Sequence, residues 1–104
     1  MYYEAQHRRL RVAGVCGDDD VPTLCEAVRT LTRTGDSLIV DLTAVTAMTA
    51  EVADALLAAQ ALAQAMARTC RVTLLRKSRG PVDRCLRAAL PESCRGAGPG
   101  RSLS

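Results

Sequence analysis

The sequence predicts an α/β fold, in which a mixed four-stranded sheet with one short N-terminal edge strand is packed with three helices. Three observations support this expectation. Short apolar runs alternate along the chain with longer stretches whose apolar residues recur at helical spacing. Gly, Pro or Asp marks several of the boundaries between them. The length of 104 residues suits one domain with one modest core.

The first half of the chain is expected to hold two strands and a helix. Residues 1–6 are weakly patterned and suit the short edge strand, whereas residues 10–15 alternate in the manner of a strand. Asp20 is expected to cap a helix that runs to about Arg33 and ends at Gly35.

The centre of the chain predicts a buried strand and a long helix. Residues 37–43 form a nearly continuous apolar run, which is typical of a central strand. Residues 44–48 are expected to be a connection, and a helix should then span 50–68. Its buried stripe is expected to contain Val52, Leu56, Ala59, Ala63 and Met66.

The last part of the domain predicts one more strand and helix. We expect a strand at 71–75, a loop at 76–80 and a short helix that begins at Pro81. The residues of this helix that should face inward are Val82, Cys85, Leu86 and Ala89. The single domain is therefore expected to span 1–90. Residues 91–104 are rich in Gly, Ser, Arg and Pro and are expected to be disordered.

The composition argues against several classes of function. The chain has no Trp or Phe, two Tyr and a formal net charge of +3. This charge is too small to indicate a nucleic-acid partner, and the chain lacks central aromatic residues on which bases could stack. No stretch approaches the roughly 20 uncharged apolar residues of a membrane span, and no signal peptide is recognisable. We expect a cytoplasmic protein that binds neither nucleic acid nor membrane.

The cysteines predict no metal or redox site. There are five of them, an odd number, and no pair has the C-x-x-C spacing. We expect small buried hydrophobic residues in a reducing compartment. Cys94 lies in the tail and is the one candidate for an exposed thiol.

Residues for enzyme chemistry are sparse. His7 is the one histidine and should be solvated near a strand edge, and no glycine-rich phosphate-binding motif is present. The run Asp18-Asp19-Asp20 is expected to be a solvated turn rather than a cation site. No catalytic residue, metal or cofactor is therefore expected. An enzyme or ligand-binding domain that uses Asp41, this run and Glu51 as a carboxylate cluster is the least favoured alternative.

The junction between the central strand and the long helix is more informative. Thr49 is placed to be the N-cap of the helix, and Glu51 lies in its first turn. A hydroxyl or carboxylate at such a position accepts backbone N–H bonds and is stabilised by the helix dipole. A phosphoryl group would also be stabilised there.

The segment 41–48 and the helix after it, together with the elements at 10–17, 71–75 and 82–86, follow one another in a familiar order. On these segments, residues 8–90 resemble the STAS domain of bacterial anti-sigma-factor antagonists. The segment Asp41-Leu42-Thr43-Ala44-Val45-Thr46-Ala47-Met48 is similar to the family's strand ending in Asp-Leu-Ser and the turn that follows it. Residues 10–17 resemble the first strand and its Gly-Glu-Leu-Asp turn. Residues 71–75 and 82–86 resemble the last strand and helix.

The chain departs from the family at the phosphorylation site. The phosphoacceptor serine aligns with Glu51, the serine before it with Ala50 and the glycine after it with Val52. The family's aspartate before the serines aligns with Thr49, which would be the acceptor only after a shift of two residues. The aspartate of the Gly-Glu-Leu-Asp turn aligns with Gly17, and Asp18 is adjacent.

The resemblance implies a non-enzymatic regulator of transcription that binds an anti-sigma factor or a related kinase-like ATPase. It places partner binding on the strand–helix junction 44–52 and the 17–20 turn, at Gly17, Asp18, Asp19, Thr46, Met48, Thr49, Ala50, Glu51 and Val52. The usual serine position would not be phosphorylated, and the chain would be a monomer or weak homodimer. The alternative is a structural STAS subunit that works by oligomerisation, through the Ala-rich helix or a sheet edge.

Overall fold

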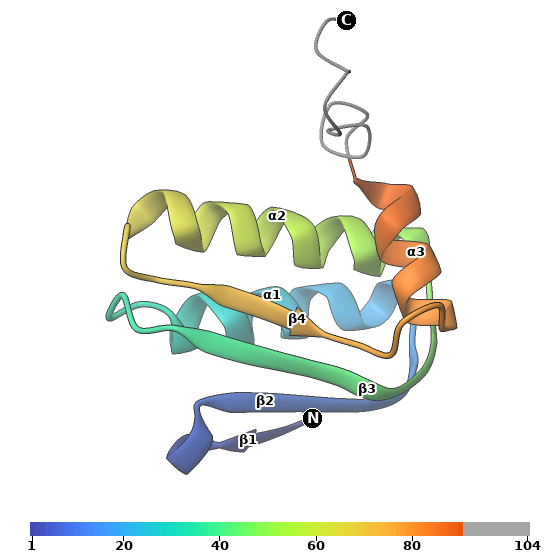
Figure 1. The fold of residues 1–104 in the computed structure, drawn as a ribbon, viewed down its shortest axis with the longest axis horizontal. Coiled ribbons are helices and arrows are strands. Elements are labelled where there is room, and N and C mark those ends of the chain that lie inside the picture. Colours follow the sequence, from blue (N-terminus) through green and yellow to red (C-terminus); the bar gives the residue numbers. More distant parts are fainter. Residues whose placement is uncertain (91–104) are drawn as a thin grey trace, which may run out of the picture.

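A computed structural model describes residues 1–90 of the chain (Figure 1). Its elements are β1 (Tyr2–Glu4), β2 (Arg9–Cys16), α1 (Val21–Leu31), β3 (Leu38–Met48), α2 (Ala50–Met66), β4 (Val72–Leu75) and α3 (Pro81–Ala89), with 3-10 turns at Ala5–His7 and Asp18–Asp20. The predicted α/β fold, a mixed four-stranded sheet with three helices, is confirmed. The expected disorder of residues 91–104 lies outside the described residues, as does Cys94.

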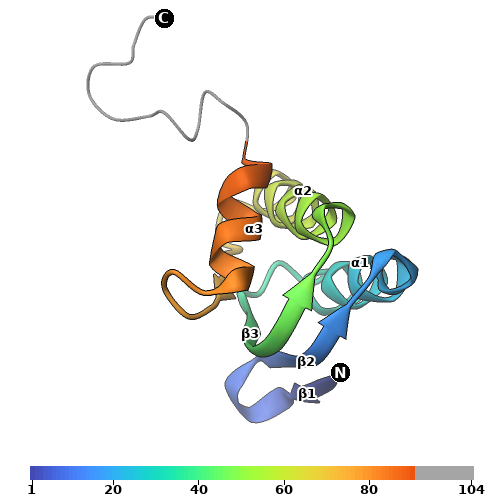
Figure 2. The ribbon, with the colours of Figure 1, turned by 90° about the vertical axis from the view of Figure 1, so that its right-hand side faces the viewer.

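The four strands lie in the order β1-β2-β3-β4. β1 pairs with β2 in antiparallel orientation, whereas β2, β3 and β4 are parallel to one another. α1 connects β2 to β3, and α2 connects β3 to β4. Figure 2, which views the sheet nearly end-on, shows that all three helices lie on the same side of it. The opposite face is not covered by any helix within residues 1–90, and we call it the bare face.

The core lies between the sheet and the three helices and is built from small aliphatic side chains. Val40, Val52 and Ala53 have no exposed surface, and Leu10, Leu24, Leu56 and Leu86 are almost as deeply buried. Tyr3 is the one aromatic residue that packs against this cluster, and it is only partly buried. Branched and small aliphatic residues bring helices close to a sheet, so the lack of Trp and Phe is compatible with a well-packed core.

The predicted connection at residues 44–48 is wrong, because β3 continues through it to Met48. The extra residues pair with the second half of β2, from Ala13↔Ala44 to Cys16↔Met48, across two irregularities in register. These irregularities interrupt the alternation of buried and exposed side chains, so the segment loses the period of two by which a strand is recognised. Small residues such as Ala44 and Ala47 then resemble a turn.

The predicted ends of α1 and α2 are too late. α1 ends at Leu31, where Thr32 donates its side-chain hydroxyl to the Val28 carbonyl at 2.7 Å. Gly35 adopts a left-handed conformation, with φ of 85°, in the turn that follows rather than at the helix end. α2 ends at Met66, which is 79% exposed and therefore does not belong to the buried stripe.

The capping role predicted for Asp20 is also different in the structure. Its side chain makes no bond to the first turn of α1. Instead, its Oδ2 accepts a hydrogen bond of 2.9 Å from the N–H of Gly17 and closes the 3-10 turn before the helix.

Two glutamines of α2 bind the outer edge of the sheet. Gln60 donates its side-chain amide to the carbonyl of Val72 at 2.7 Å, and Gln64 accepts a bond of 3.2 Å from the N–H of the same residue. Both backbone groups of Val72 are therefore occupied, although no strand within residues 1–90 lies beyond β4 on that side. This contact also fixes α2 against the start of β4.

α3 contains a buried acid that the sequence did not single out. Asp83 is 5% exposed and lies between Arg76 and Arg87, whose Nε atoms are 3.1 and 3.2 Å from its oxygens. Its Oδ2 also accepts a hydrogen bond of 3.1 Å from the N–H of Arg79. This N–H first, and then Arg76, hold the pKa of Asp83 below its ordinary value. Asp83 therefore anchors the loop before α3.

Candidate functional site

The candidate site lies where β2 and β3 end and α1 and α2 begin. Because β2 and β3 are parallel, their carboxyl ends meet at the same edge of the sheet, and the residues after them become neighbours. The 17–20 turn follows β2, and the β3–α2 junction follows β3. The backbone N–H of Thr49 donates to the carbonyl of Cys16 at 3.2 Å and holds the two segments together.

Thr49 is the residue that organises this edge. It is the N-cap of α2, as predicted, and its Oγ1 accepts a hydrogen bond of 3.3 Å from the N–H of Val52. The same hydroxyl donates to Oδ1 of Asp18 at 2.6 Å. The Thr49 side chain therefore caps the helix and links it to the turn after β2.

The structure brings most of the predicted binding residues together in one surface. We call the exposed residues of this edge the junction surface, which comprises Asp18, Asp19, Thr49, Ala50 and Glu51. Thr46 is exposed as well, but it lies within β3 and faces a hollow that Lys77 and Gly80 also line. Gly17 and Met48 are half-buried beside it. Val52 differs, since its side chain is completely buried and belongs to the core. Val52 is therefore unable to touch a partner, and its role is to hold the first turn of α2 against the sheet.

The junction surface is strongly acidic. Asp18, Asp19 and Glu51 of this surface are exposed, and two further exposed acids lie beside it, Asp20 at the end of the turn and Asp54 in the next turn of α2. These carboxylates lie near the amino-terminal ends of α1 and α2, where the helix dipoles stabilise negative charge. A surface of this kind favours a partner that presents positive charge. The sequence analysis did not include Asp54, although its spacing of three residues from Glu51 on a helix predicts a shared face.

α3 supports the junction from inside. The thiol of Cys85 lies 3.7 Å from the carbonyl oxygen of Met48 and 3.6 Å from that of Thr49, close enough for weak S–H hydrogen bonds. Helical spacing correctly indicated that Cys85 faces inward. The sequence carried no signal that it would face the end of β3.

The carboxylate cluster considered as an enzyme site is not formed. Asp41 lies on the bare face, in the middle of β3, where its closest charged neighbours are Arg9 and Arg11. It is therefore separated from Glu51 and the 17–20 turn. Within the part of the chain that the structure describes, no three His, Cys, Asp or Glu side chains are arranged to hold a metal ion.

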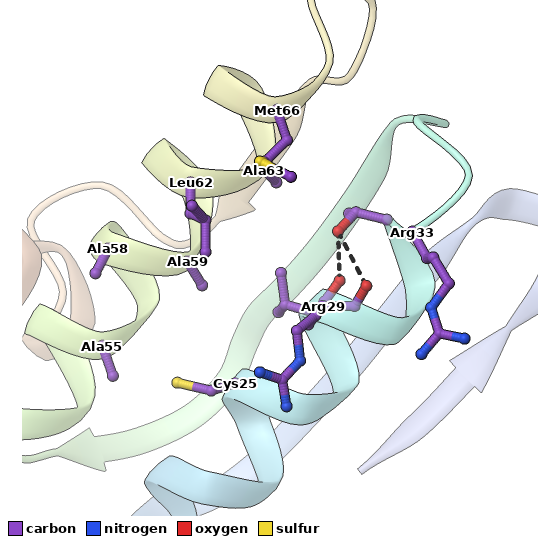
Figure 3. A pocket seen from close by; sticks show the side chains of 11 residues that line it. Cys25, Arg29, Arg33, Ala55, Ala58, Ala59, Leu62, Ala63 and Met66 are labelled. Atoms are coloured by element: carbon purple, nitrogen blue, oxygen red, sulfur yellow. Dashed lines mark hydrogen bonds between the residues drawn. The ribbon is translucent and has the colours of Figure 1, made fainter.

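A second surface feature lies between α1 and α2 (Figure 3). It is a groove of about 440 Å³, lined by small side chains of α2 such as Ala55, Ala59 and Ala63 and bordered by Arg29 of α1 and by Arg33 in the turn after α1. Leu62 and Met66 of α2 line the groove and are 59% and 79% exposed. The sequence analysis placed Ala59 and Ala63 in the buried stripe, and it named the Ala-rich helix as a contact only in the oligomerisation alternative.

Comparisons with known proteins support the fold but not a function. No family model matches the chain, and no curated protein matches it either. The chain is similar to a solved structure described as a crystal structure analysis of Mglu, with a TM-score of 0.64 and 17% sequence identity. The match covers 76% of this chain and 20% of that one. None of the helices within residues 1–90 has the length and apolar character that crossing a membrane requires.

Proposed function

We propose that this chain is a non-enzymatic, cytoplasmic regulatory module of the STAS type that binds an anti-sigma factor or a related kinase-like ATPase through the junction surface. The observation that carries this proposal is the hydrogen bond of 2.6 Å from Thr49 to Asp18. It joins the two segments that the family resemblance assigns to partner binding. Together they form one exposed surface at the carboxyl ends of parallel strands, where α/β proteins usually bind their ligands.

The proposed module carries a fixed charge where the resembling family carries a phosphorylated serine. Glu51 is exposed in the first turn of α2, and its carboxylate offers no hydroxyl for phosphoryl transfer. Its single negative charge is about half to two thirds of that on a phosphoserine. Thr49 is a poor alternative acceptor, because its hydroxyl already binds Asp18 and the N–H of Val52.

A capture experiment tests this function. The full chain, Glu51→Ser and Glu51→Lys would each be immobilised and exposed to host lysate, and retained proteins would be identified by mass spectrometry. We expect the wild-type chain to retain a kinase-like ATPase and Glu51→Lys to retain much less, because reversing a charge in the middle of an interface introduces repulsion.

Arg33→Glu is the matched control, since it reverses one exposed charge in the turn after α1, away from the junction surface. Retention of the ATPase by Glu51→Ser alone would mean that Glu51 is a built-in off state. If no variant retains such an ATPase, the proposed partner class is wrong. Equal loss with Arg33→Glu would mean that the junction surface is not the binding site.

A second candidate function is a structural subunit that works by oligomerisation. The groove between α1 and α2 favours it, because Leu62 and Met66 expose large apolar side chains beside a hollow lined by alanines (Figure 3). Exposed apolar patches often mark contacts between proteins. If assembly uses this groove, Leu62→Glu should abolish higher oligomers in sedimentation velocity, and an oligomer that persists unchanged in Leu62→Glu would exclude it.

A further inference from the structure

The bare face of the sheet has the character of a covered surface although the described part of the chain leaves it open. Sheets of parallel strands nearly always have both faces packed. Here Tyr2, Val15 and Leu75 are 64%, 73% and 38% exposed, and the pairing of the strands places all three on the bare face. A second layer on this face would bury them.

Charged groups on the bare face are incompletely bonded. Asp41 is 5% exposed, and its Oδ2 lies 3.7 Å from Nε of Arg11 and 3.9 Å from Nη1 of Arg9, beyond hydrogen-bond distance. Oε1 of Glu4 and Nε of Arg9 are enclosed and have no hydrogen-bond partner within residues 1–90. Unmade bonds at enclosed polar atoms are costly, so a further polar partner on this face would be stabilising.

The strand register arranges these side chains in two rows across the sheet. The first row is Tyr2, Arg11, Asp41 and Leu75, on β1 to β4 in that order. The second row is Glu4, Arg9, Ile39 and Thr73. The first row has an apolar residue at each end and opposite charges in the middle. If a second copy of this row faces it in the reverse order, each apolar residue meets an apolar residue and each charge meets the opposite charge.

We propose that the bare face binds a second copy of this chain in a two-fold symmetric dimer whose axis runs parallel to the strands, between β2 and β3. This axis places β1 over β4 of the partner and β2 over β3 of the partner. Because the axis is parallel to the strands, the rotation leaves the position of each residue along the strand direction unchanged. In the first row, Arg11 then meets Asp41 of the partner subunit, and Tyr2 meets Leu75 of the partner subunit. Each contact occurs twice, as two-fold symmetry requires.

Two alternatives fit this face less well. An axis across the strands, midway between the two rows, would place Arg11 opposite the partner's Arg9 and would juxtapose like charges. Residues 91–104 contain one large aliphatic residue, Leu103, and so offer little apolar surface to cover Tyr2, Val15 and Leu75. Strands that run parallel in the two subunits also match the aligned packing of sheets, with its angle of about 30°.

The dimer does not depend on the proposed partner-binding function. The junction surface lies at the edge of the sheet and on its helix side, so dimerisation through the bare face leaves it accessible. Both junction surfaces would lie at the same end of the dimer, because the axis runs along the strands.

Sedimentation equilibrium of the full chain across the micromolar range tests the proposal. We expect a concentration-dependent dimer whose dissociation constant rises at least about tenfold in Arg11→Glu, because both Arg11–Asp41 contacts become repulsive. Arg33→Glu makes the same charge change in the turn after α1, away from the bare face, and should leave the dissociation constant unchanged. A wild-type chain that stays monomeric throughout, or a dimer that Arg33→Glu weakens and Arg11→Glu does not, would overturn the proposal.

Mixing variants tests the pairing directly. Arg11→Glu and Asp41→Lys should each be monomeric alone, yet form a heterodimer when mixed, because every facing pair is then opposite in charge. Tyr2→Lys mixed with Leu75→Glu repeats this test at two exposed positions whose substitution does not endanger folding. A heterodimer no tighter than the homodimers in the Tyr2 and Leu75 mixture would show that these residues do not face each other.

Discussion

The two faces of the sheet are built from the same strands by opposite rules. On the face under the helices, β3 contributes Leu38, Val40 and Leu42, which are at most 1% exposed and wholly aliphatic. On the bare face, the same strand contributes Asp41, and β2 contributes Arg9 and Arg11. The covered face is held by the removal of apolar surface from water, whereas the bare face is held by charge and hydrogen bonds.

This difference shows that burial alone does not define the core. Asp41 is about as well buried as several core residues, but it is enclosed by arginine side chains rather than by a second layer of the fold. Thr43 stabilises its carboxylate with a hydroxyl bond of 2.6 Å and an N–H bond of 3.0 Å to Oδ1. Substitutions on the two faces should therefore lower the free energy of unfolding by different amounts, and this loss should depend on pH in different ways.

The largest effect is expected on the covered face. Leu42→Ala should lower the free energy of unfolding by about 2–5 kcal/mol, since it leaves a cavity at a position that is 1% exposed. Leu75→Ala is the matched substitution on the bare face, where the side chain is 38% exposed, and should cost less than about 1 kcal/mol. Urea denaturation at a low protein concentration measures both, and equal losses would contradict the comparison.

Removal of the buried acid of the bare face should have an intermediate effect. Asp41→Ala eliminates both hydrogen bonds from Thr43 and leaves Arg9 and Arg11 without their shared carboxylate, so we expect a loss of about 1–3 kcal/mol in urea denaturation. Asp54→Ala, an exposed acid on α2, serves as the control and should change stability by less than about 0.5 kcal/mol.

Acidification should weaken the charged contacts and spare the apolar ones. Burial raises the pKa of Asp41, but the bonds from Thr43 and the charges of Arg11 and Arg9 outweigh it and hold the pKa below its ordinary value of 3.8. The pKa of Asp83 is also lowered, chiefly by the N–H of Arg79. A carboxyl whose pKa is lower in the folded state stabilises the fold above its unfolded pKa, and this contribution disappears as the pH falls through the folded pKa.

We therefore expect the unfolding free energy of the wild-type chain to decrease below about pH 4. Urea midpoints recorded from neutral to acidic pH would show a shallower decrease in Asp41→Ala. Parallel profiles for the two proteins would mean that Asp41 does not titrate with a lowered pKa.

A smaller loss of stability is expected when Thr49 is replaced at the carboxyl end of the sheet. Thr49→Ala should cost about 1 kcal/mol, because α2 loses its N-cap and the hydroxyl bond to Asp18 disappears. Thr49→Ser keeps the hydroxyl and should retain most of the stability. If thermal unfolding shows that Thr49→Ser loses as much stability as Thr49→Ala, packing of the methyl group rather than the N-cap explains the loss.

The smallest effect is expected at Glu51. Its carboxylate is exposed and acts on α2 only through the dipole of the first turn, so Glu51→Gln should cost about 0.3–1 kcal/mol at low salt and less at high salt. Thermal unfolding at two salt concentrations measures this difference. A larger loss that does not depend on salt would indicate a specific contact of Glu51 that the structure lacks.

Helices and strands were predictable from the sequence where the pattern of apolar residues within the segment itself decides the conformation. The apolar run from Leu38 and the cap at Thr49 are visible in the sequence, and both were located correctly. The second half of β3 was missed because its pairing with β2, across irregularities in register, decides its conformation. Pairing between distant segments leaves no local period in the chain.

The bare face could not have been predicted without the strand order. Right-handed crossovers place α1 and α2 on one side only when successive parallel strands are added in one direction, as β2, β3 and β4 are here. An order that reversed after β3 would have placed the helices on both faces. For the junction surface, the sequence indicated two segments that the fold brings together, but the burial of Val52 and the support from Cys85 could be seen only in the fold.

The two glutamines bound to Val72 have a consequence for aggregation. An edge strand with free N–H and C=O groups is a template on which further strands can be added, up to fibrils. On β4 this template is blocked at Val72 by Gln60 and Gln64, and at the opposite edge β1 is only three residues long. Removal of both side-chain amides would leave the N–H and C=O groups of Val72 free at the outer edge of β4. A strand of another chain could then pair with β4, and repeated pairing of this kind would extend the sheet through many chains.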